Sequence, residues 1–290
     1  MKQALALVGL ICILLCGCTA PPESADIAAT TLPVYQFTTL LCDGTGLSVT
    51  RLVTESVSCL HDYSLNVSQV KAVESADLVV ISGAGLEDFM GDLLHDRKTI
   101  DASHGISLLD SCHDHAHEHH HDHSHEHDAH IWLSPANAIT MARNICAGLC
   151  RQYPQHTERF QRNLEDLILR LEELQDYANA RLSGISCREI ITFHDGFSYM
   201  AQAFDLHILT AVEEESGAEI SARELIELIE LARAHHLPAI FTETNGADSA
   251  ARIIATETGA GIFTLDMAMA GDDYFEAMYH NIDTIQEALK

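Results

Sequence analysis

The residues with the most chemical potential in this sequence are its histidines, because ten of the 19 lie between positions 113 and 130. There imidazoles alternate with Asp, Glu and Ser in the run HDHAHEHHHDHSHEHDAH. Neutral imidazole is the commonest metal-ligating side chain and suits zinc, copper and nickel. Because this composition offers no apolar face to bury, we predict a solvated loop over residues 113–129.

This loop should hold metal loosely, because many equivalent ligands on a flexible chain form several weak, exchanging complexes. We expect it to capture, buffer or sense metal, with the interleaved acids raising the local cation concentration. A purification tag or a solubilising stretch is the alternative, but the run is internal and lacks the Gly/Ser flanks of a tag. The accessory ligands are His113, His115, His117, His119, His120, His121, His123, His125 and His127.

Three histidines occupy a different kind of position, where a predicted strand gives way to a loop or helix. They are His61, His130 and His194, and Asp266 stands in the same way after the last predicted strand. Ligands of open α/β sheets gather at the carboxyl ends of strands, and in a two-lobed protein those ends can face one another across a cleft. Three imidazoles and one carboxylate can complete a tetrahedral zinc site with bonds of about 2.0–2.2 Å. Singly, such a histidine is more often structural and such an aspartate a helix cap, so only the set indicates a site.

The elements that would position these residues follow a strand–helix–strand rhythm. Residues 154–182 keep apolar residues three or four apart without Gly or internal Pro, which predicts a helix about 43 Å long. Ser221 and Glu224 have capping-box spacing at the start of another helix. We predict strands or β-rich runs over 32–41, 77–82, 98–102, 106–109, 189–193, 206–212, 238–242 and 261–265, and further helices over 68–75, 135–152, 221–236, 250–258 and 273–289.

This order of elements predicts an α/β fold of two lobes, each with a central sheet, joined by one long rigid helix. A surface helix on one large domain is the alternative for the long segment. The expected organisation is a signal peptide over 1–18, a flexible tether over 19–31, an N-terminal lobe over 32–152, a linking helix over 153–183 and a C-terminal lobe over 184–290.

The N-terminus has the pattern of an export signal. Lys2 precedes an apolar run over residues 4–15 that is too short to span a bilayer. The run ends at Leu15-Cys16-Gly17-Cys18, which resembles the bacterial lipobox, so we expect acylation of Cys18 and anchoring to a membrane surface. An ordinary signal cleaved near Ala20 is the alternative.

The composition narrows the class of protein. A hydrophobic content of 47% with 20% charged residues indicates a globular chain and excludes a multi-span membrane protein. The formal net charge of −27 argues against nucleic-acid binding and favours cations. Beyond Cys18, an exterior location permits disulfides, and free buried thiols are equally open. The six cysteines concerned are Cys42, Cys59, Cys112, Cys146, Cys150 and Cys187.

The motifs around the three histidines resemble those of the substrate-binding lipoproteins of bacterial ABC transporters for zinc and manganese. The resemblance runs from the lipobox to the C-terminus. Its motifs are His61-Asp62-Tyr63, His130-Ile131-Trp132-Leu133-Ser134-Pro135, Phe193-His194-Asp195-Gly196-Phe197-Ser198-Tyr199, Gly83-Ala84-Gly85-Leu86-Glu87 and Gly271-Asp272-Asp273-Tyr274.

This resemblance implies a metal bound in the interlobe cleft and delivered to a membrane permease. By position it implies His61, His130 and His194 as ligands, with Asp266 or water as the fourth. A histidine as the third ligand, His194, resembles the zinc branch of the family, and so does the His-rich loop. Nitrogen ligands agree with zinc, since manganese prefers carboxylate oxygen. Four departures from the family pattern lie beside the ligands and bear on their orientation: Leu60, Ser64-Leu65, Asp128-Ala129 and Ser134.

Other functions fit the same residues less well. The alternatives within this class are a manganese-binding member, a surface adhesin and a metal chaperone. A metallohydrolase would need an open metal position and a general base such as Asp195, Glu214 or Glu215, and no HExxH-like motif accompanies them. We therefore expect no enzyme but an exported, lipid-anchored protein, on the periplasmic or outer cell-surface side, that carries Zn²⁺, with Mn²⁺ the less favoured ion.

Overall fold

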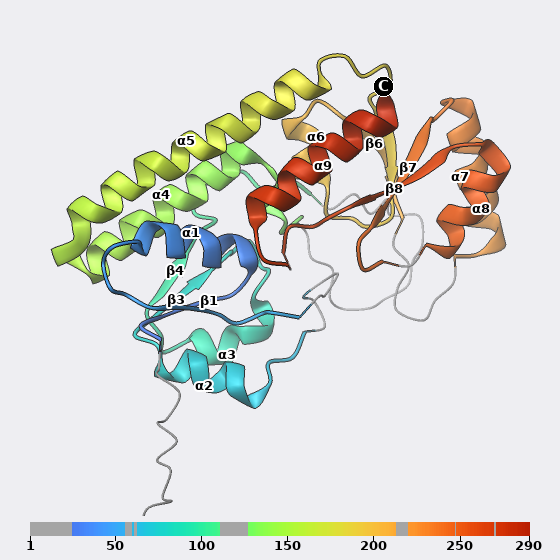
Figure 1. Ribbon diagram of the computed structural model, residues 1–290. Coiled ribbons are helices and arrows are strands. Elements are labelled where there is room, and N and C mark those ends of the chain that lie inside the picture. Colours follow the sequence, from blue (N-terminus) through green and yellow to red (C-terminus); the bar gives the residue numbers. More distant parts are fainter. Residues whose placement is uncertain are drawn as a thin grey trace, which may run out of the picture.

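The computed structural model describes residues 25–55, 60, 63–110, 127–212, 220–246, 248–269 and 271–290. Over these residues the chain forms two four-stranded parallel sheets, ordered β2-β1-β3-β4 and β6-β5-β7-β8. Helices pack around each sheet, and the long helix α5 runs between the two lobes (Figure 1). The predicted two-lobed α/β fold is confirmed.

The first lobe is built around the sheet that contains β1. Its central strands are buried, with no exposed surface on any residue of β1. Its elements are β1 (Ile27–Ala29), α1 (Leu32–Cys42), β2 (Val49–Arg51), α2 (Val67–Ser75), β3 (Leu78–Ile81), a 3₁₀ turn (Asp88–Met90), α3 (Gly91–Leu94), β4 (Thr99–Asp101), a second 3₁₀ turn (Ile131–Leu133) and α4 (Pro135–Gln152).

Two predictions at the start of this lobe are wrong. The β-rich run expected over residues 32–41 is helix α1, which has Pro33 in its first turn, where the fixed φ of proline suits a helix. Val34, Phe37 and Leu41 are buried at helical spacing, so packing overrides the β-favouring composition. The first strand lies instead at Ile27–Ala29, inside the tether expected over 19–31. That tether prediction is therefore wrong from residue 27 onward.

The strand predicted over residues 106–109 is also absent from the structure. Leu109 pairs its backbone elsewhere: its N–H donates to the hydroxyl of Tyr199 at 2.9 Å, and its carbonyl accepts from the N–H of Asp128 at 2.9 Å. Satisfied by these two partners, the segment needs no neighbouring strand.

Helix α5 (Thr157–Leu182) has 26 residues and follows a 3₁₀ turn at Pro154–His156, so the helix predicted from 154 begins slightly later. It buries one apolar face, including Phe160, Leu171 and Leu182. Helix α4 runs alongside it in Figure 1, and α9 (Tyr274–Leu289) returns from the second lobe to pack on it. Contacts with both lobes make α5 the structural link between them.

The second lobe is built around the sheet that contains β5. Helix α7 begins with the capping box predicted from Ser221 and Glu224, in which each side chain accepts from the other residue's N–H. The elements are β5 (Glu189–Thr192), α6 (Ser198–Ala203), β6 (His207–Ala211), α7 (Ala222–Ala234), β7 (Ala239–Glu243), α8 (Ser249–Thr258), β8 (Gly261–Leu265) and α9.

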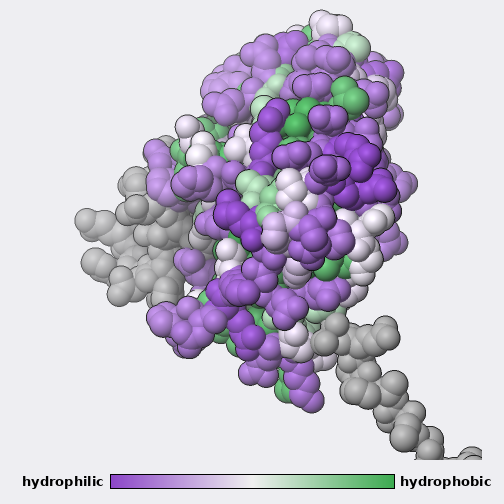
Figure 2. Space-filling view, turned by 90° about the vertical axis from the view of Figure 1, so that its left-hand side faces the viewer, coloured by the Kyte–Doolittle hydropathy of each residue, from purple (hydrophilic) through white to green (hydrophobic). Residues whose placement is uncertain are grey.

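The described cysteines carry free thiols. These are Cys42, Cys146, Cys150 and Cys187, while Cys18, Cys59 and Cys112 lie outside the described residues. The expected signal peptide lies outside them too. No helix in the described part of the chain is long and apolar enough to span a bilayer. Hydrophilic residues cover most of the face shown in Figure 2, with hydrophobic residues only in small scattered groups.

Candidate metal site

Two of the four predicted ligands lie together where the lobes meet. His194 follows β5 of the second sheet, and His130 precedes the 3₁₀ turn that leads into α4. Their ring centroids are 5.3 Å apart with the ring planes inclined by 81°. Both are shielded from water, with 4% of the His130 side chain and 12% of the His194 side chain exposed. The structure thus pairs two imidazoles that are far apart in sequence.

Gly196 lies between these imidazoles. A Cβ atom at this position would be 2.8 Å from Nδ1 of His130 and 2.7 Å from Cδ2 of His194. It would also be 2.7 Å from Cε of Met267, in the segment that follows β8. Only a glycine allows these three segments to approach so closely. The missing side chain therefore brings residues 130, 194 and 267 to one point.

A buried carboxylate holds His130 in place. Asp128 Oδ1 accepts from the backbone N–H of His130 at 2.8 Å and lies 2.9 Å from its Nδ1. Burial alone would raise the pKa of Asp128, but hydrogen bonds from His130 and Ser198 and the charge of His130 outweigh it and lower that pKa. The carboxylate therefore stays ionised, and a histidine bound through Nδ1 keeps Nε2 for a metal.

A second carboxylate stands behind His194. Glu243, at the end of β7, is buried, and its Oε2 lies 3.6 Å from Nδ1 of His194. This distance is that of an ion pair rather than of a hydrogen bond. His130 and His194 thus each have an acidic group on the Nδ1 side, as metal-binding histidines commonly do.

The segment after β8 is firmly held beside this pair. Trp132 Nε1 donates to the carbonyl of Met267 at 2.8 Å, and the Tyr274 hydroxyl donates to the carbonyl of Trp132 at 2.7 Å. Asn281 accepts from the N–H of Asp266 at 2.8 Å and donates to its carbonyl at 2.7 Å. These bonds fix the backbone on which the predicted fourth ligand stands.

The Asp266 side chain itself accepts from the N–H of Ala268 at 2.7 Å. Within the residues that the structure describes, no three His, Cys, Asp or Glu side chains form a group that could hold a metal ion. The structure therefore brings His130 and His194 together but does not add Asp266 to them as a third ligand.

The remaining predicted ligand, His61, lies outside the described residues. Its neighbours are anchored: Leu60 is fully buried, and the Tyr63 hydroxyl donates to Glu55 at 2.7 Å and accepts from Gln69 at 2.6 Å.

Most of the accessory loop also lies outside the described residues, from His113 to His125. Its last histidine, His127, is described and forms an isolated antiparallel bridge with Asp110. The Nδ1 atom of His127 lies 3.3 Å from Oδ1 of Asp110. The two ends of the His-rich segment therefore meet, three residues before His130.

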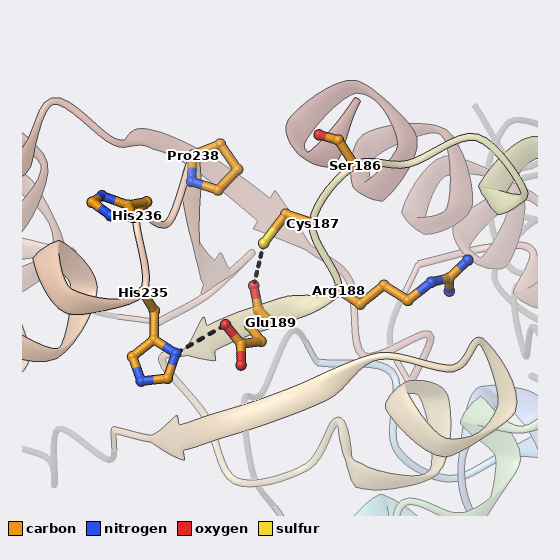
Figure 3. Close-up of a pocket in the computed structure, with 7 residues that line it drawn as sticks. All are labelled: Ser186, Cys187, Arg188, Glu189, His235, His236 and Pro238. Carbon is orange, nitrogen blue, oxygen red and sulfur yellow. Dashed lines mark hydrogen bonds and ion pairs between the residues drawn. The ribbon is translucent and has the colours of Figure 1, made fainter.

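A second group of potential ligands lines a pocket of about 430 Å³ at the amino ends of β5 and β7, the end of the second sheet opposite to His194 (Figure 3). His235 Nδ1 lies 2.9 Å from Oε2 of Glu189, and the Cys187 thiol donates to the Glu189 carbonyl at 3.4 Å. Among the described residues these side chains do not form a group of three that could hold a metal ion.

Sequence reasoning missed Asp128, Gly196 and Glu243 as parts of the site. Glu243 had a detectable signal, because it ends a predicted strand just as Asp266 does. Asp128 stands two residues before a predicted ligand, a spacing at which a side chain can reach the backbone N–H. The closeness of Gly196 depends on contacts between distant segments and had no such signal.

Comparisons with known proteins identify the family to which the chain belongs. The family model described as "Zinc-uptake complex component A periplasmic" matches residues 27–288. The high-affinity zinc uptake system protein ZnuA of Bacillus subtilis is 28% identical, over 94% of this chain and 92% of its own. A crystal structure of a ZnuA deletion mutant with zinc bound superposes with a TM-score of 0.77 at 26% identity, covering 92% of this chain and 99% of the other.

Longer relatives match as well. The zinc-binding protein AdcA of Streptococcus pyogenes serotype M1 is 30% identical over 90% of this chain, which spans only 55% of the AdcA length.

Proposed function

Because this chain belongs to the family of periplasmic zinc-uptake complex component A, we propose that His61, His130 and His194 bind the transported zinc ion, with Asp266 or water as the fourth ligand. The protein is a zinc-binding, extracytoplasmic substrate-binding protein of a metal ABC transporter and not an enzyme. A membrane permease is its partner, to which it delivers the metal.

The observation that carries this assignment is the pairing of His130 and His194 around Gly196. The His130 ring is buried and the His194 side chain is only 12% exposed, and each has a carboxylate on the Nδ1 side, so we assign Nε2 as the metal-binding atom of each. Imidazole nitrogen suits zinc better than manganese, whose sites are richer in carboxylate oxygen. Asp266 is included because it directly follows β8, and His61 because of the family motif.

Calorimetric titration with zinc tests the site. His194→Ala should lose the high-affinity step in a protein from which residues 114–126 have been deleted. His235→Ala is the matched control, because it removes an imidazole from the pocket at the amino ends of β5 and β7, at the other end of the same sheet. A tight step that survives in His194→Ala would contradict the assignment, as would its loss in His235→Ala.

The His-rich loop has a separate role in this proposal: it holds additional, weaker zinc and is dispensable for the tight site. The bridge between Asp110 and His127 supports this design, since it closes the base of the loop and allows a short linker to replace it. Elemental analysis at saturating zinc should give more than one ion per intact chain and about one per loop-deleted chain. Equal stoichiometry in both proteins would refute the accessory role.

We propose further that Cys18 is acylated and anchors the protein to the membrane from outside the cytoplasm. The lipobox-like residues 15–18 and the export signal support this. Expression in a bacterium fed a labelled fatty acid should label the native chain and not Cys18→Ser. Label retained by Cys18→Ser would place the lipid elsewhere.

A further inference from the structure

Tyr199 of the second lobe reaches the base of the His-rich segment in the first. It lies in α6 and is buried, with 1% of its surface exposed. Its hydroxyl accepts from the N–H of Leu109 at 2.9 Å and donates to the carbonyl of Asp128 at 3.1 Å. These two residues flank the His-rich segment, so one hydroxyl joins both of its ends to α6.

The contact continues to the metal site through Asp128. The N–H of Asp128 donates to the carbonyl of Leu109, and its carboxylate binds both the N–H and the Nδ1 side of His130. The side chain of Asp128 is fully buried. Asp128 therefore links Tyr199 to His130: Tyr199 bonds its backbone carbonyl, and its carboxylate contacts the imidazole of His130.

Burial makes this chain effective. A buried hydrogen bond is strengthened by its low-dielectric surroundings, and a buried group that loses its partner has no water to replace it. Burial raises the pKa of Tyr199, so its hydroxyl keeps the proton that it donates to Asp128. The backbone of Asp128 is thus fixed from the second lobe, and with it the direction of its carboxylate.

We propose that Tyr199 is a positioning residue of the zinc site: its hydroxyl holds Asp128 so that His130 presents Nε2 to the metal before the metal arrives. The inference rests on the function proposed above, because it takes His130 as a ligand. Tyr199 itself contacts neither imidazole through this hydroxyl and acts only through Asp128.

The test is Tyr199→Phe, which keeps the buried ring and removes only the oxygen. Its matched control is Tyr177→Phe on α5, which loses a hydroxyl bonded to Asp283 at 2.7 Å, outside the site. We expect zinc affinity to fall about 10-fold or more in Tyr199→Phe, as for other residues that orient metal ligands, and to stay unchanged in the control.

Imidazole ¹⁵N NMR of the metal-free proteins distinguishes positioning from general structural damage. The ¹⁵N shifts of His130 should change in Tyr199→Phe, and in the same direction in Asp128→Asn, while those of His194 stay as in the wild type. Wild-type affinity and His130 shifts in Tyr199→Phe would overturn the inference. So would equal changes at His130 and His194, which would indicate disturbed packing.

A failure of the Tyr199 proposal can be told apart from a failure of the proposed zinc site. That failure would appear in the wild-type protein as a missing tight step, or in His194→Ala as a retained one, whatever the behaviour of Tyr199→Phe.

Discussion

Glu87 provides a direct test of how burial controls charge in this protein. Its Oε1 atom accepts from the Thr30 hydroxyl at 2.6 Å and the Ser82 N–H at 2.8 Å, and its Oε2 atom accepts from the Gly83 N–H at 2.9 Å. Complete burial nevertheless raises the pKa of Glu87 to about 7, with a smaller contribution from the charge of Asp101.

The raised pKa of Glu87 stabilises the folded protein at low pH and not at high pH. The folded protein holds the Glu87 proton more tightly than the unfolded chain, whose carboxyl has the ordinary pKa of about 4.5. The stabilising contribution of this proton is therefore complete below about pH 4.5 and is lost as the pH rises through about 7. The difference between the two pKa values corresponds to about 3 kcal/mol of unfolding free energy.

The perturbation is Glu87→Gln, which removes the titration. The amide nitrogen of glutamine cannot accept from the Gly83 N–H, so the variant loses one buried hydrogen bond at every pH, at a cost of about 1–3 kcal/mol. Near pH 5 the variant should thus be the less stable protein. As the pH rises to about 8.5, the difference should shift in its favour by about 2.5 kcal/mol, because only the wild type then carries a buried charge.

Urea unfolding of the metal-free proteins at several pH values measures this difference. Trp132, the single tryptophan, is fully buried and reports unfolding by its fluorescence. Comparing two proteins at each pH cancels the titration of all other groups. Glu172→Gln, on the exposed face of α5, controls for the chemistry of the substitution and should change stability by less than about 0.5 kcal/mol. A Glu87→Gln difference that stays constant from about pH 5 to about pH 8.5 would refute the reasoning.

Three further substitutions test the packing around the site. Gly196→Ala should weaken zinc binding about 10-fold or more, because the new Cβ would press on both imidazoles. Gly184→Ala is the control and should bind zinc like the wild type, since a Cβ at that position has no atom within 4 Å. Equal zinc affinities of the two variants by calorimetry would contradict this. Asn281→Leu should cost about 1–3 kcal/mol in urea unfolding, since two hydrogen bonds to the Asp266 backbone are lost; an unchanged midpoint would show that those bonds contribute nothing. Ser221→Ala should cost about 1 kcal/mol through its capping box and leave zinc affinity unchanged, and a change in affinity would be the unexpected result.

Local sequence patterns predicted the elements that carry their own signals. Helix α4 begins at Pro135 and α7 begins at its capping box, as expected, whereas the Ser134 cap of α4 was not predicted. Helix α1 was mistaken for a strand because Val34, Tyr35, Phe37 and the two threonines that follow favour strands by composition. Its helical state is fixed by burial of one face in the core, which depends on residues far away in the sequence.

The site was predictable only in part, for a similar reason. The sequence placed both His130 and His194 at strand ends; the two rings do lie together, but only His194 follows a strand, whereas His130 precedes a 3₁₀ turn. The contact between Tyr199 and Asp128 joins residues 71 positions apart, and no spacing rule reports a hydrogen bond across two lobes. Pairings of this kind arise from how the lobes pack, which local periodicity does not encode.

The structure also shows what distinguishes the two proposed kinds of zinc ligand. His127 and His130 are three residues apart, and each has an aspartate on its Nδ1 side. The side chain of His127 is 43% exposed and that of its partner Asp110 90%, whereas the corresponding values for His130 and Asp128 are 4% and 0%. An exposed pair is screened by water and exchanges partners readily, but a buried pair keeps one orientation. We therefore attribute the proposed difference between loose capture at His127 and tight binding at His130 to burial and not to the choice of side chains.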